Sequence, residues 1–283
     1  MSNTILITGA SGNIGSALLK QLGSSNAKVI AGSSTGKPVP GVETRHVDLA
    51  SPATLPAAFA GIDTLFLLLP LQKNMTELAK NAIDAAKTAG VQHIVRSSGA
   101  GADAASPVAI ARVQGEIDQM VMNSGLAYTI TRPTSFMQNY INFYGAMIKA
   151  GALYLPQADG KISLVDVSDI AAVNALILQN PAAHAGQIYT LTGPVALSNR
   201  DIADRIGLAL NKKIDYVSVP DQAAIEAMQG MGMDAWNIEV LMSLNQIIAA
   251  GYTAGISDDV GQLLGTAPVG FDQFVQRSLA AWQ

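Results

Sequence analysis

Residues 4–15 read Thr4-Ile5-Leu6-Ile7-Thr8-Gly9-Ala10-Ser11-Gly12-Asn13-Ile14-Gly15, a short apolar run followed by three evenly spaced glycines. The pattern predicts a strand over 4–8, a tight turn over 9–12 and a helix over 13–22. Gly9 would permit the turn, Gly12 would let a pyrophosphate approach the backbone, and Gly15 would let the helix pack closely on the sheet. Unpaired N–H groups at the start of the helix would hold the phosphate charge.

A second apolar strand, Lys28-Val29-Ile30-Ala31, follows this helix. A strand, a glycine turn, a helix and a second strand form the βαβ setting that a dinucleotide site requires, whereas an ordinary strand-to-helix turn is the alternative. We therefore predict a dinucleotide site. Its first contacts would be Gly9, Ala10, Ser11, Gly12, Asn13 and Ile14.

The composition excludes several classes of protein. A chain of 283 residues with 49% hydrophobic content can bury a large core. The net charge of -4, without runs of Lys or Arg, argues against nucleic acid or an anionic membrane as partner. No cysteine is present and the three histidines are scattered, so we expect no metal site. The longest apolar run, 65–69, is too short to cross a membrane and no signal pattern is visible, so we expect a soluble cytoplasmic protein.

Strand and helix signals alternate through the first half of the chain, which predicts an α/β fold with a Rossmann-type doubly wound parallel sheet. After the first two strands, the predicted strands cover 42–47, 63–69, 93–97 and 127–132, and the predicted helices cover 74–89 and 110–123. We predict that residues 1–133 form this dinucleotide-binding core.

Beyond Pro133 the pattern is interrupted by glycine and proline. It predicts strands over 161–165 and 187–191, helices near 199–210 and 223–233, and a helix that Ser168 or Asp169 would cap. We expect residues 134–283 to form mainly a smaller C-terminal α/β substrate-binding lobe, with some segments returning to the core.

The loop after the second strand bears on the choice between NAD and NADP. NAD sites usually place an acidic residue there to accept hydrogen bonds from the ribose hydroxyls. Residues 31–37 instead read Ala-Gly-Ser-Ser-Thr-Gly-Lys, and Ser33, Ser34 and Lys37 would tolerate a 2′-phosphate. We predict NADP(H) as the cofactor, with NAD as the alternative if Lys37 simply points to water.

Five motifs occur in order along nearly the whole chain, over 8–15, 47–49, 89–95, 124–133 and 136–139. Together they resemble the NmrA-like group of atypical short-chain dehydrogenases/reductases. This group includes NADPH-dependent quinone oxidoreductases, triphenylmethane and azo-dye reductases, isoflavone-type reductases and the redox-sensing regulator NmrA. Its members usually carry an arginine that grips the 2′-phosphate, whereas this chain has Ser34 at that place.

The resemblance implies further cofactor contacts, ordered from the adenine to the nicotinamide. They are Asp48 and Leu49, then Leu68, Leu69 and Pro70, then Ser97 and Ser98, and last Pro133, Thr134, Ser135 and Phe136. From the residues alone, Asp48 could equally be a turn residue and Pro70 could simply end a strand.

Proton chemistry has no obvious side chain. No tyrosine has a lysine four residues on, as ordinary short-chain dehydrogenases require, and Lys149 follows Tyr144 by five. Gln114 stands where isoflavone-type reductases carry a lysine, and an amide does not readily supply a proton. The catalytic residues are therefore unknown, and the candidates are Gln114, Tyr140 and Asn139.

Apolar and aromatic residues gather just after the loop that would cover the nicotinamide. They would form either a pocket for a flat apolar substrate or plain core packing. Asn139 and Gln138 are the polar groups there that would orient a carbonyl oxygen. The predicted substrate contacts are Phe136, Asn139, Tyr140 and Phe143.

The leading hypothesis is an NAD(P)H-dependent reductase that transfers hydride to a quinone-like or conjugated aromatic acceptor, which then takes its proton from water. One alternative is a non-catalytic NADP(H)-sensing regulatory protein of NmrA type, and another is a reductase of a specific biosynthetic intermediate. The expected partner is a small aromatic or quinone-like molecule. The sequence leaves the oligomeric state open between a monomer and a homodimer.

Overall fold

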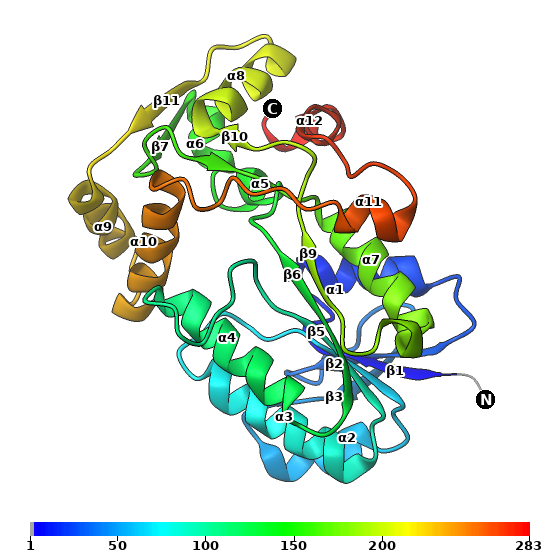
Figure 1. Cartoon of the computed structure of the whole chain (residues 1–283). Coiled ribbons are helices and arrows are strands. Elements are labelled where there is room, and N and C mark those ends of the chain that lie inside the picture. The colour runs from blue at the N-terminus through cyan, green and yellow to red at the C-terminus, as the bar shows by residue number, and fades with distance from the viewer. Residues whose placement is uncertain (1–2) are drawn as a thin grey trace. The chain divides into compact units, whose positions relative to one another are not determined.

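The computed structural model describes residues 3–283, which divide into two compact units (Figure 1). The first unit comprises the chain through Pro107, Ala111–Pro133 and Val167–Thr190. The second comprises Val108–Ile110, Thr134–Asp166 and Leu191–Gln283.

The first unit is built on a seven-stranded sheet in the order β3-β2-β1-β4-β5-β6-β9. Its strands are β1 (Thr4–Ile7), β2 (Lys28–Ser33), β3 (Glu43–His46), β4 (Thr64–Leu67), β5 (His93–Ser97), β6 (Ala127–Pro133) and β9 (Ile188–Leu191). The neighbours from β3 to β6 pair in parallel. Backbone hydrogen bonds from Ile130 to Gln187 and from Thr134 to Leu191 advance together, so β9 is parallel to β6 as well.

Helices cover both faces of this sheet (Figure 1), which confirms the predicted doubly wound α/β fold. The helices are α1 (Asn13–Leu22), α2 (Leu55–Phe59), α3 (Met75–Ala89), α4 (Ala109–Met122) and α7 (Val167–Gln179), with 3-10 turns η1 (Pro52–Thr54) and η2 (Pro181–His184). Helices α1 and α7 pack against each other, as do α2 and α3 on the other face. Helix α1 buries Ile14, Leu18 and Leu22 on one side, as its apolar spacing predicts.

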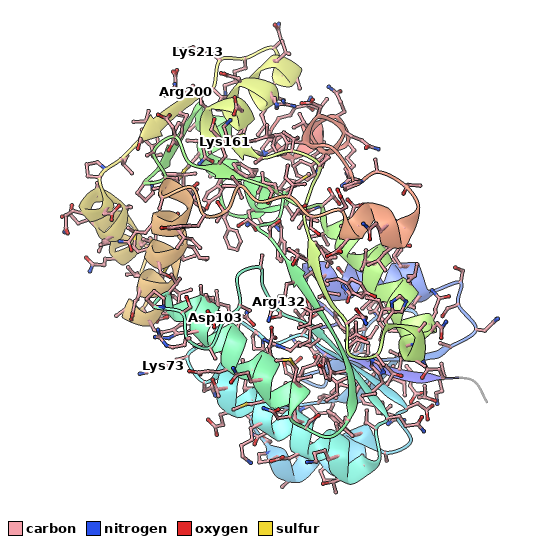
Figure 2. The ribbon with its side chains drawn as sticks, in the orientation of Figure 1. Lys73, Asp103, Arg132, Lys161, Arg200 and Lys213 are labelled. Carbon is pink, nitrogen blue, oxygen red and sulfur yellow. The ribbon has the colours of Figure 1, made fainter. Side chains whose placement is uncertain are left out.

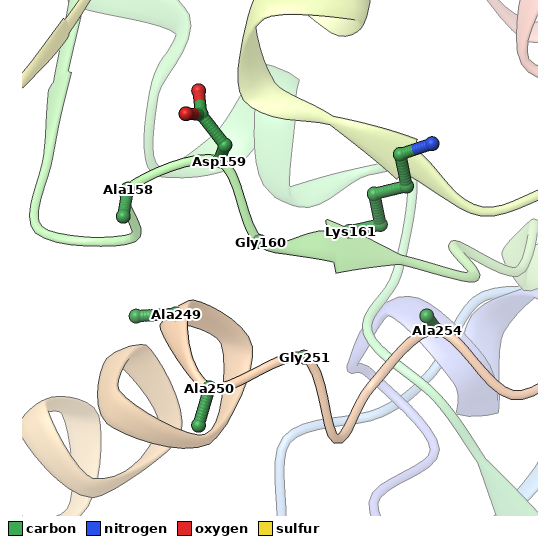
Figure 3. Close-up of a pocket in the computed structure, with 8 residues that line it drawn as sticks. All are labelled: Ala158, Asp159, Gly160, Lys161, Ala249, Ala250, Gly251 and Ala254. Atoms are coloured by element: carbon green, nitrogen blue, oxygen red, sulfur yellow. The ribbon is translucent and has the colours of Figure 1, made fainter.

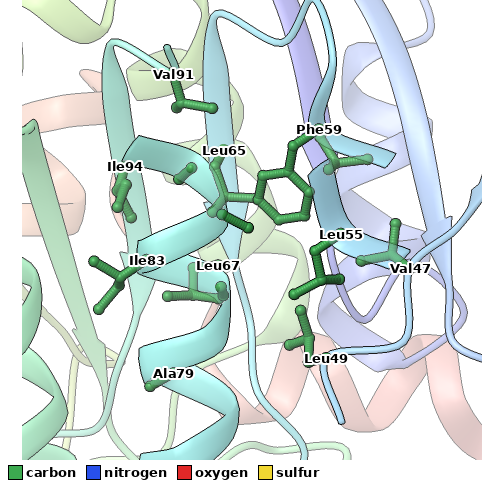
Figure 4. Packing of buried hydrophobic residues seen from close by; sticks show 14 of the residues in the cluster. Val47, Leu49, Leu55, Phe59, Leu65, Leu67, Ala79, Ile83, Val91 and Ile94 are labelled. Atoms are coloured by element: carbon green, nitrogen blue, oxygen red, sulfur yellow. The ribbon is translucent and has the colours of Figure 1, made fainter. Parts of the chain in front are cut away.

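The core of the first unit lies between the sheet and helices α2 to α4 (Figure 4). All four residues of β4 are buried because this central strand is covered from both sides. Phe59, Leu65, Leu67 and Ile94 have no exposed surface and meet in this cluster. Each such side chain contributes about 1.5–3 kcal/mol to stability by leaving water.

The second unit contains two small sheets, in which β7 pairs in parallel with β11 and β8 pairs antiparallel with β10. These strands are β7 (Ala152–Leu155), β8 (Lys161–Ile162), β10 (Leu197–Ser198) and β11 (Asp215–Ser218). The helices are α5 (Asn139–Asn142), α6 (Gly145–Ala150), α8 (Asn199–Leu210), α9 (Asp221–Gly230), α10 (Ala235–Ala249), α11 (Asp259–Leu264) and α12 (Phe271–Ser278), followed by a 3-10 turn η3 (Leu279–Ala281). Tyr140, Phe271, Phe274 and Trp282 are buried together in a separate core.

Several local expectations for this half of the chain were wrong. The strand expected over 161–165 stops at Ile162, because Ser163 and Val165 bond to the loops at Thr253 and Ser135 instead. Helix α7 begins at Val167, so Ser168 and Asp169 lie in its first turn rather than at its cap. Helix α10 was not predicted, because its apolar residues occur on all sides and give no clear helical period.

Within residues 3–283, no helix combines the length and the apolar character that crossing a bilayer requires. The same residues contain no group of three side chains arranged to hold a metal ion.

A buried histidine joins β5 to β6. The Thr129 hydroxyl donates to the carbonyl oxygen of His184 at 2.8 Å, so it accepts from Nε2 of His93 at 2.9 Å. His93 is only 4% exposed, and this burial, with a smaller contribution from His184, lowers its pKa to about 4. The folded chain therefore holds His93 neutral under mildly acidic conditions.

We expect the free energy of unfolding to fall between pH 7 and pH 5. The unfolded chain binds a proton at His93 below about pH 6.5, whereas the folded chain resists it until about pH 4, so folding loses on the order of 2 kcal/mol at pH 5. Urea titrations at the two pH values measure this loss. His93→Gln keeps an N–H donor for Thr129 but does not titrate, and an equally large loss in that variant would contradict the assignment.

Candidate functional site

The strand order reverses between β1 and β4, and in open α/β sheets ligands bind outside the carboxyl ends of the strands at such a point. Thr8 fixes these two strand ends to each other. Its Oγ1 accepts from the backbone N–H of Leu68 at 2.8 Å and lies 2.9 Å from the carbonyl oxygen of Leu68, to which it donates. The glycine turn and residues 68–70 are thereby held side by side.

The three glycines of the turn differ in what surrounds them. Gly9 has a φ of +64°, and a Cβ there would lie 3.0 Å from Cδ2 of Leu68. A Cβ on Gly15 would lie 2.1 Å from the carbonyl oxygen of Gly9, so only glycine permits this approach of α1. Gly12 is exposed in an extended conformation, and its Cβ would come no closer than 3.4 Å to that oxygen. Packing therefore explains Gly9 and Gly15, whereas the open space at Gly12 fits an external group.

The start of α1 is open to an anion. Its cap residue Gly12 offers no side chain, and the first turn contains no acidic residue. Ser11 and Asn13 are exposed beside it, whereas Ala10 is 1% exposed and packs inward. The free N–H groups and the positive end of the helix dipole fit a pyrophosphate, so this chain can hold the predicted dinucleotide here.

The loop expected to receive a 2′-phosphate follows β2. Ser34 and Lys37 are exposed and Ser33 is half-buried. A turn closes from the Gly36 N–H to the Ser33 carbonyl oxygen at 3.3 Å. His46 was not among the predicted contacts, yet its Nε2 lies 3.1 Å from the carbonyl oxygen of Ser34 and braces the loop from behind.

The arginine on the neighbouring strand β3 makes its contacts away from this loop. Arg45 donates through Nη1 to the carbonyl oxygens of Ala58 and Ala60, and its Nε faces Glu43. Arg45 therefore joins β3 to the end of α2. Lys37 is therefore the positively charged side chain that the loop itself contains.

Asp48 and Leu49, expected beside the adenine, have structural contacts. The Asp48 carboxylate accepts from the Ser51 hydroxyl at 2.7 Å and from the Ala50 N–H at 3.0 Å, and these bonds lower its pKa. Leu49 is 8% exposed and packs in the first unit's core. The geometry favours a turn role for Asp48, although its remaining lone pairs stay available.

Residues 68–70 border the turn in different ways. Leu68 contacts Gly9 with its side chain, Leu69 is buried in the core, and Pro70 is exposed.

The end of β5 contains unusual buried polar groups. Among residues 3–283, the buried side-chain atoms without a hydrogen-bond partner are Arg96 Nη1, Ser97 Oγ and Ser98 Oγ. Buried polar groups are nearly always paired, so three consecutive exceptions need an explanation. Backbone bonds from Ser98 to Thr131 and from Ala100 to Pro133 continue the β5 and β6 pairing past this point. Hydroxyls held there fit the ribose and nicotinamide end of the predicted cofactor.

Helix α4 carries Gln114 close to these serines. The loop after β5 packs against Gly115, where a Cβ would lie 2.2 Å from the Ala104 nitrogen. Figure 2 shows Asp103 on this loop at the amino end of α4 and Arg132 on β6. A Cβ on Gly99 would lie 3.9 Å from Cγ of Gln114, so the glutamine borders the loop that continues from Ser98.

Residues 134–136 belong to the second unit. Thr134 bonds to Leu191 through its backbone N–H at 3.0 Å, and its hydroxyl donates to the Ser163 carbonyl oxygen. Ser135 accepts from the Val165 N–H at 3.0 Å, and half-buried Phe136 pairs with Val165 in an isolated bridge. The loop after Pro133 is therefore held by backbone bonds within its own unit.

The aromatic group after Phe136 has two different environments. The chain forms two short helices here, α5 and α6, and Phe143 between them is 71% exposed. Tyr140 is 2% exposed, its hydroxyl donates to Oδ1 of Asn199 at 2.6 Å, and burial raises its pKa well above the usual value. This geometry favours core packing for Tyr140 over proton transfer. Asn139 is half-buried at the start of α5.

A cavity of about 480 Å³ lies elsewhere in the second unit (Figure 3). It is lined by Ala158, Asp159, Gly160, Lys161, Ala249, Ala250, Gly251 and Ala254. None of the predicted site residues is among them, and small side chains dominate. The cavity offers little chemistry, so it is not the candidate site.

Fold and site together define a dinucleotide-binding protein of the Rossmann class. The chain belongs to the NmrA-like family, whose sequence profile matches residues 1–262. The resemblance predicted from the five motifs is therefore confirmed.

Three known proteins illustrate the relationship. An NAD(P)H azoreductase from Xenophilus azovorans is 37% identical, over 98% of this chain and 99% of its own. The solved NADPH complex of quinone oxidoreductase QOR2 from Escherichia coli has a TM-score of 0.86 at 25% identity and covers 96% of this chain and 99% of that one. The NADP(H) complex of a Citrobacter sp. triphenylmethane reductase shares the fold, with a TM-score of 0.86 at 22% identity over 98% and 99% of the two chains.

We expect Gly12→Val to remain folded but to lose NADPH binding, because its extended backbone accepts valine while the added methyl groups fill the pyrophosphate space. Calorimetric titration with NADPH and a thermal melt measure the two properties. Gly15→Ala should instead lower stability, by roughly 1–3 kcal/mol, because its Cβ overlaps the Gly9 oxygen. Undiminished NADPH affinity in folded Gly12→Val would place the cofactor elsewhere.

Proposed function

We propose that this protein is an NADPH-dependent reductase that transfers hydride to quinone-like, azo or other conjugated aromatic acceptors. The observation that carries the proposal is that the carboxyl edge of the sheet fits a dinucleotide, whereas none of the candidate residues there is an activated proton donor. The similarity to an azoreductase over nearly the full length of both chains supports the same conclusion.

The lack of a proton donor restricts the acceptor. When bound, NADPH supplies hydride from C4 of its nicotinamide. An acceptor that spreads the two added electrons over a conjugated system becomes a stabilised anion and then takes a proton from water. Gln114 orients such an acceptor but does not titrate. Asn139 does not titrate either, and the raised pKa of Tyr140 keeps its proton in place. The protein contributes proximity, orientation and exclusion of water.

NADPH is the cofactor we propose, with NADH as a weaker substitute. The loop over 33–37 exposes hydroxyls and Lys37, contains no carboxylate, and is braced by His46. A 2′-phosphate meets only groups that attract or tolerate it there.

Lys37→Glu should weaken NADPH binding about three- to tenfold and leave NADH binding unchanged, because an exposed charge interacts only with the 2′-phosphate. Lys87→Glu, an exposed change of the same charge at the far end of α3, is the matched control and should affect neither. Calorimetry with both cofactors provides the measurement. If NADH affinity falls equally, Lys37 supports the loop rather than the phosphate.

The proposed activity is tested by following the absorbance of reduced NADPH with a panel of benzoquinones, naphthoquinones and azo dyes. Turnover supports the reductase. Tight NADPH binding without turnover of any acceptor favours the sensor of the NmrA type, and turnover of one specialised compound alone favours a biosynthetic reductase. The cytoplasmic location stays a prediction, which fractionation tests, and sedimentation decides between a monomer and a homodimer.

A further inference from the structure

The buried end of β5 contains a charge cluster that the cofactor contacts do not explain. Arg96 and Asp118 have no exposed side-chain surface, and Nε of Arg96 donates to Oδ1 of Asp118 at 2.8 Å. Arg132 reaches Oδ2 of the same carboxylate through Nη2 at 2.9 Å and through Nε at 3.0 Å. Two guanidinium groups thus share one carboxylate, which leaves one positive charge in excess.

Such a cluster is costly to keep. Removing charged groups from water is unfavourable, and pairing them offsets this only when each group is fully hydrogen-bonded. Here Nη1 of Arg96 is buried without a partner. An apolar residue would fill the same strand position without this penalty, so stability does not account for the arginine.

Arg96 also bonds to Gln114. Its Nη2 donates to the side-chain oxygen of the glutamine. A guanidinium has only donors, so the amide atom that faces it must be the oxygen, and the assignment of the amide follows from chemistry. The Nε2 group of Gln114 must then point away from Arg96. It donates to no other residue in the part of the chain that the structure describes, and the side chain is half-exposed.

We propose that Arg96 is a positioning residue that locks Gln114 so that its Nε2–H group donates to the acceptor atom on which negative charge develops during hydride transfer. This inference rests on the proposed reductase function. The two electrons and one proton of the hydride pass to the acceptor, the acceptor becomes an oxygen or nitrogen anion, and water later supplies its proton. The donor and the excess positive charge stabilise that anion, in the way that fixed dipoles do in an oxyanion hole.

Gln114→Glu separates this role from a structural one. Glutamate keeps the oxygen that Arg96 binds, but it replaces the N–H donor with a second acceptor and cancels the excess charge. We expect kcat to fall about a hundredfold, as when one oxyanion-hole donor is removed, while NADPH affinity stays within about twofold. Gln119→Glu makes the same change on the exposed side of α4 and should leave kcat unchanged.

Arg96→Met tests the positioning role. If Arg96 acts through Gln114, the double variant with Gln114→Ala should be no slower than Gln114→Ala alone, whereas independent roles would multiply the losses. Because Arg96→Met removes a partner of buried Asp118, its fold must first be checked by circular dichroism. Should it fail to fold, the Gln114→Glu and Gln119→Glu pair still decides the question.

A binding measurement complements turnover. The anion of 4-nitrophenol resembles a reduced quinone oxygen, and its colour reports ionisation. With NADP bound, the wild type and Gln119→Glu should bind the phenolate and lower the pKa of the phenol, and Gln114→Glu should bind it at least about tenfold more weakly. Equal turnover and equal phenolate binding in the two glutamate variants would overturn the inference alone. A wild type that neither reduces any acceptor nor binds the phenolate would overturn both the inference and the proposed function.

Discussion

The close packing of Gly15 against the backbone of Gly9 is the constraint on which the proposed cofactor site depends. No side chain fits between them, since a Cβ on Gly15 would lie 2.1 Å from the Gly9 oxygen. This approach sets the start of α1 directly after β1, and Thr8 then fixes the turn to residue 68 at the end of β4. The N–H groups of α1 consequently point to the place where the strand order reverses.

Some buried polar groups of this protein have hydrogen-bond partners within the chain, and others do not. In the second unit, Tyr140, Asn199, Gln157 and Asn245 form a chain of hydrogen bonds of 2.6, 2.5 and 2.7 Å. Each member has a partner, so the chain stabilises the core and leaves nothing for a ligand. At the end of β5 the opposite holds over residues 96–98. Satisfaction of hydrogen bonds therefore separates a structural network from a site more clearly than residue type does.

The groups around the end of β5 determine which reaction the proposed site suits. Charge is present there as a buried cluster, whereas the nearby amide of Gln114 does not titrate. A site of this kind stabilises an anion by fixed dipoles and charge, and it suits acceptors that need no proton in the transition state. The 37% identity to an NAD(P)H azoreductase agrees with a reductase function.

Sequence alone determined the dinucleotide fold, because the glycine spacing and the apolar strands are local signals. The predicted bounds of α1, Asn13–Leu22, match the structure, since its apolar positions repeat with the helical period. Only the tertiary structure decided which polar residues meet. Arg96 and Gln114 are separated by 18 residues in the sequence. Asp118 on α4 contacts both Arg96 on β5 and Arg132 on β6. It also decided that Tyr140 is buried while Phe143 is exposed, because burial depends on what packs against a residue rather than on the residue itself.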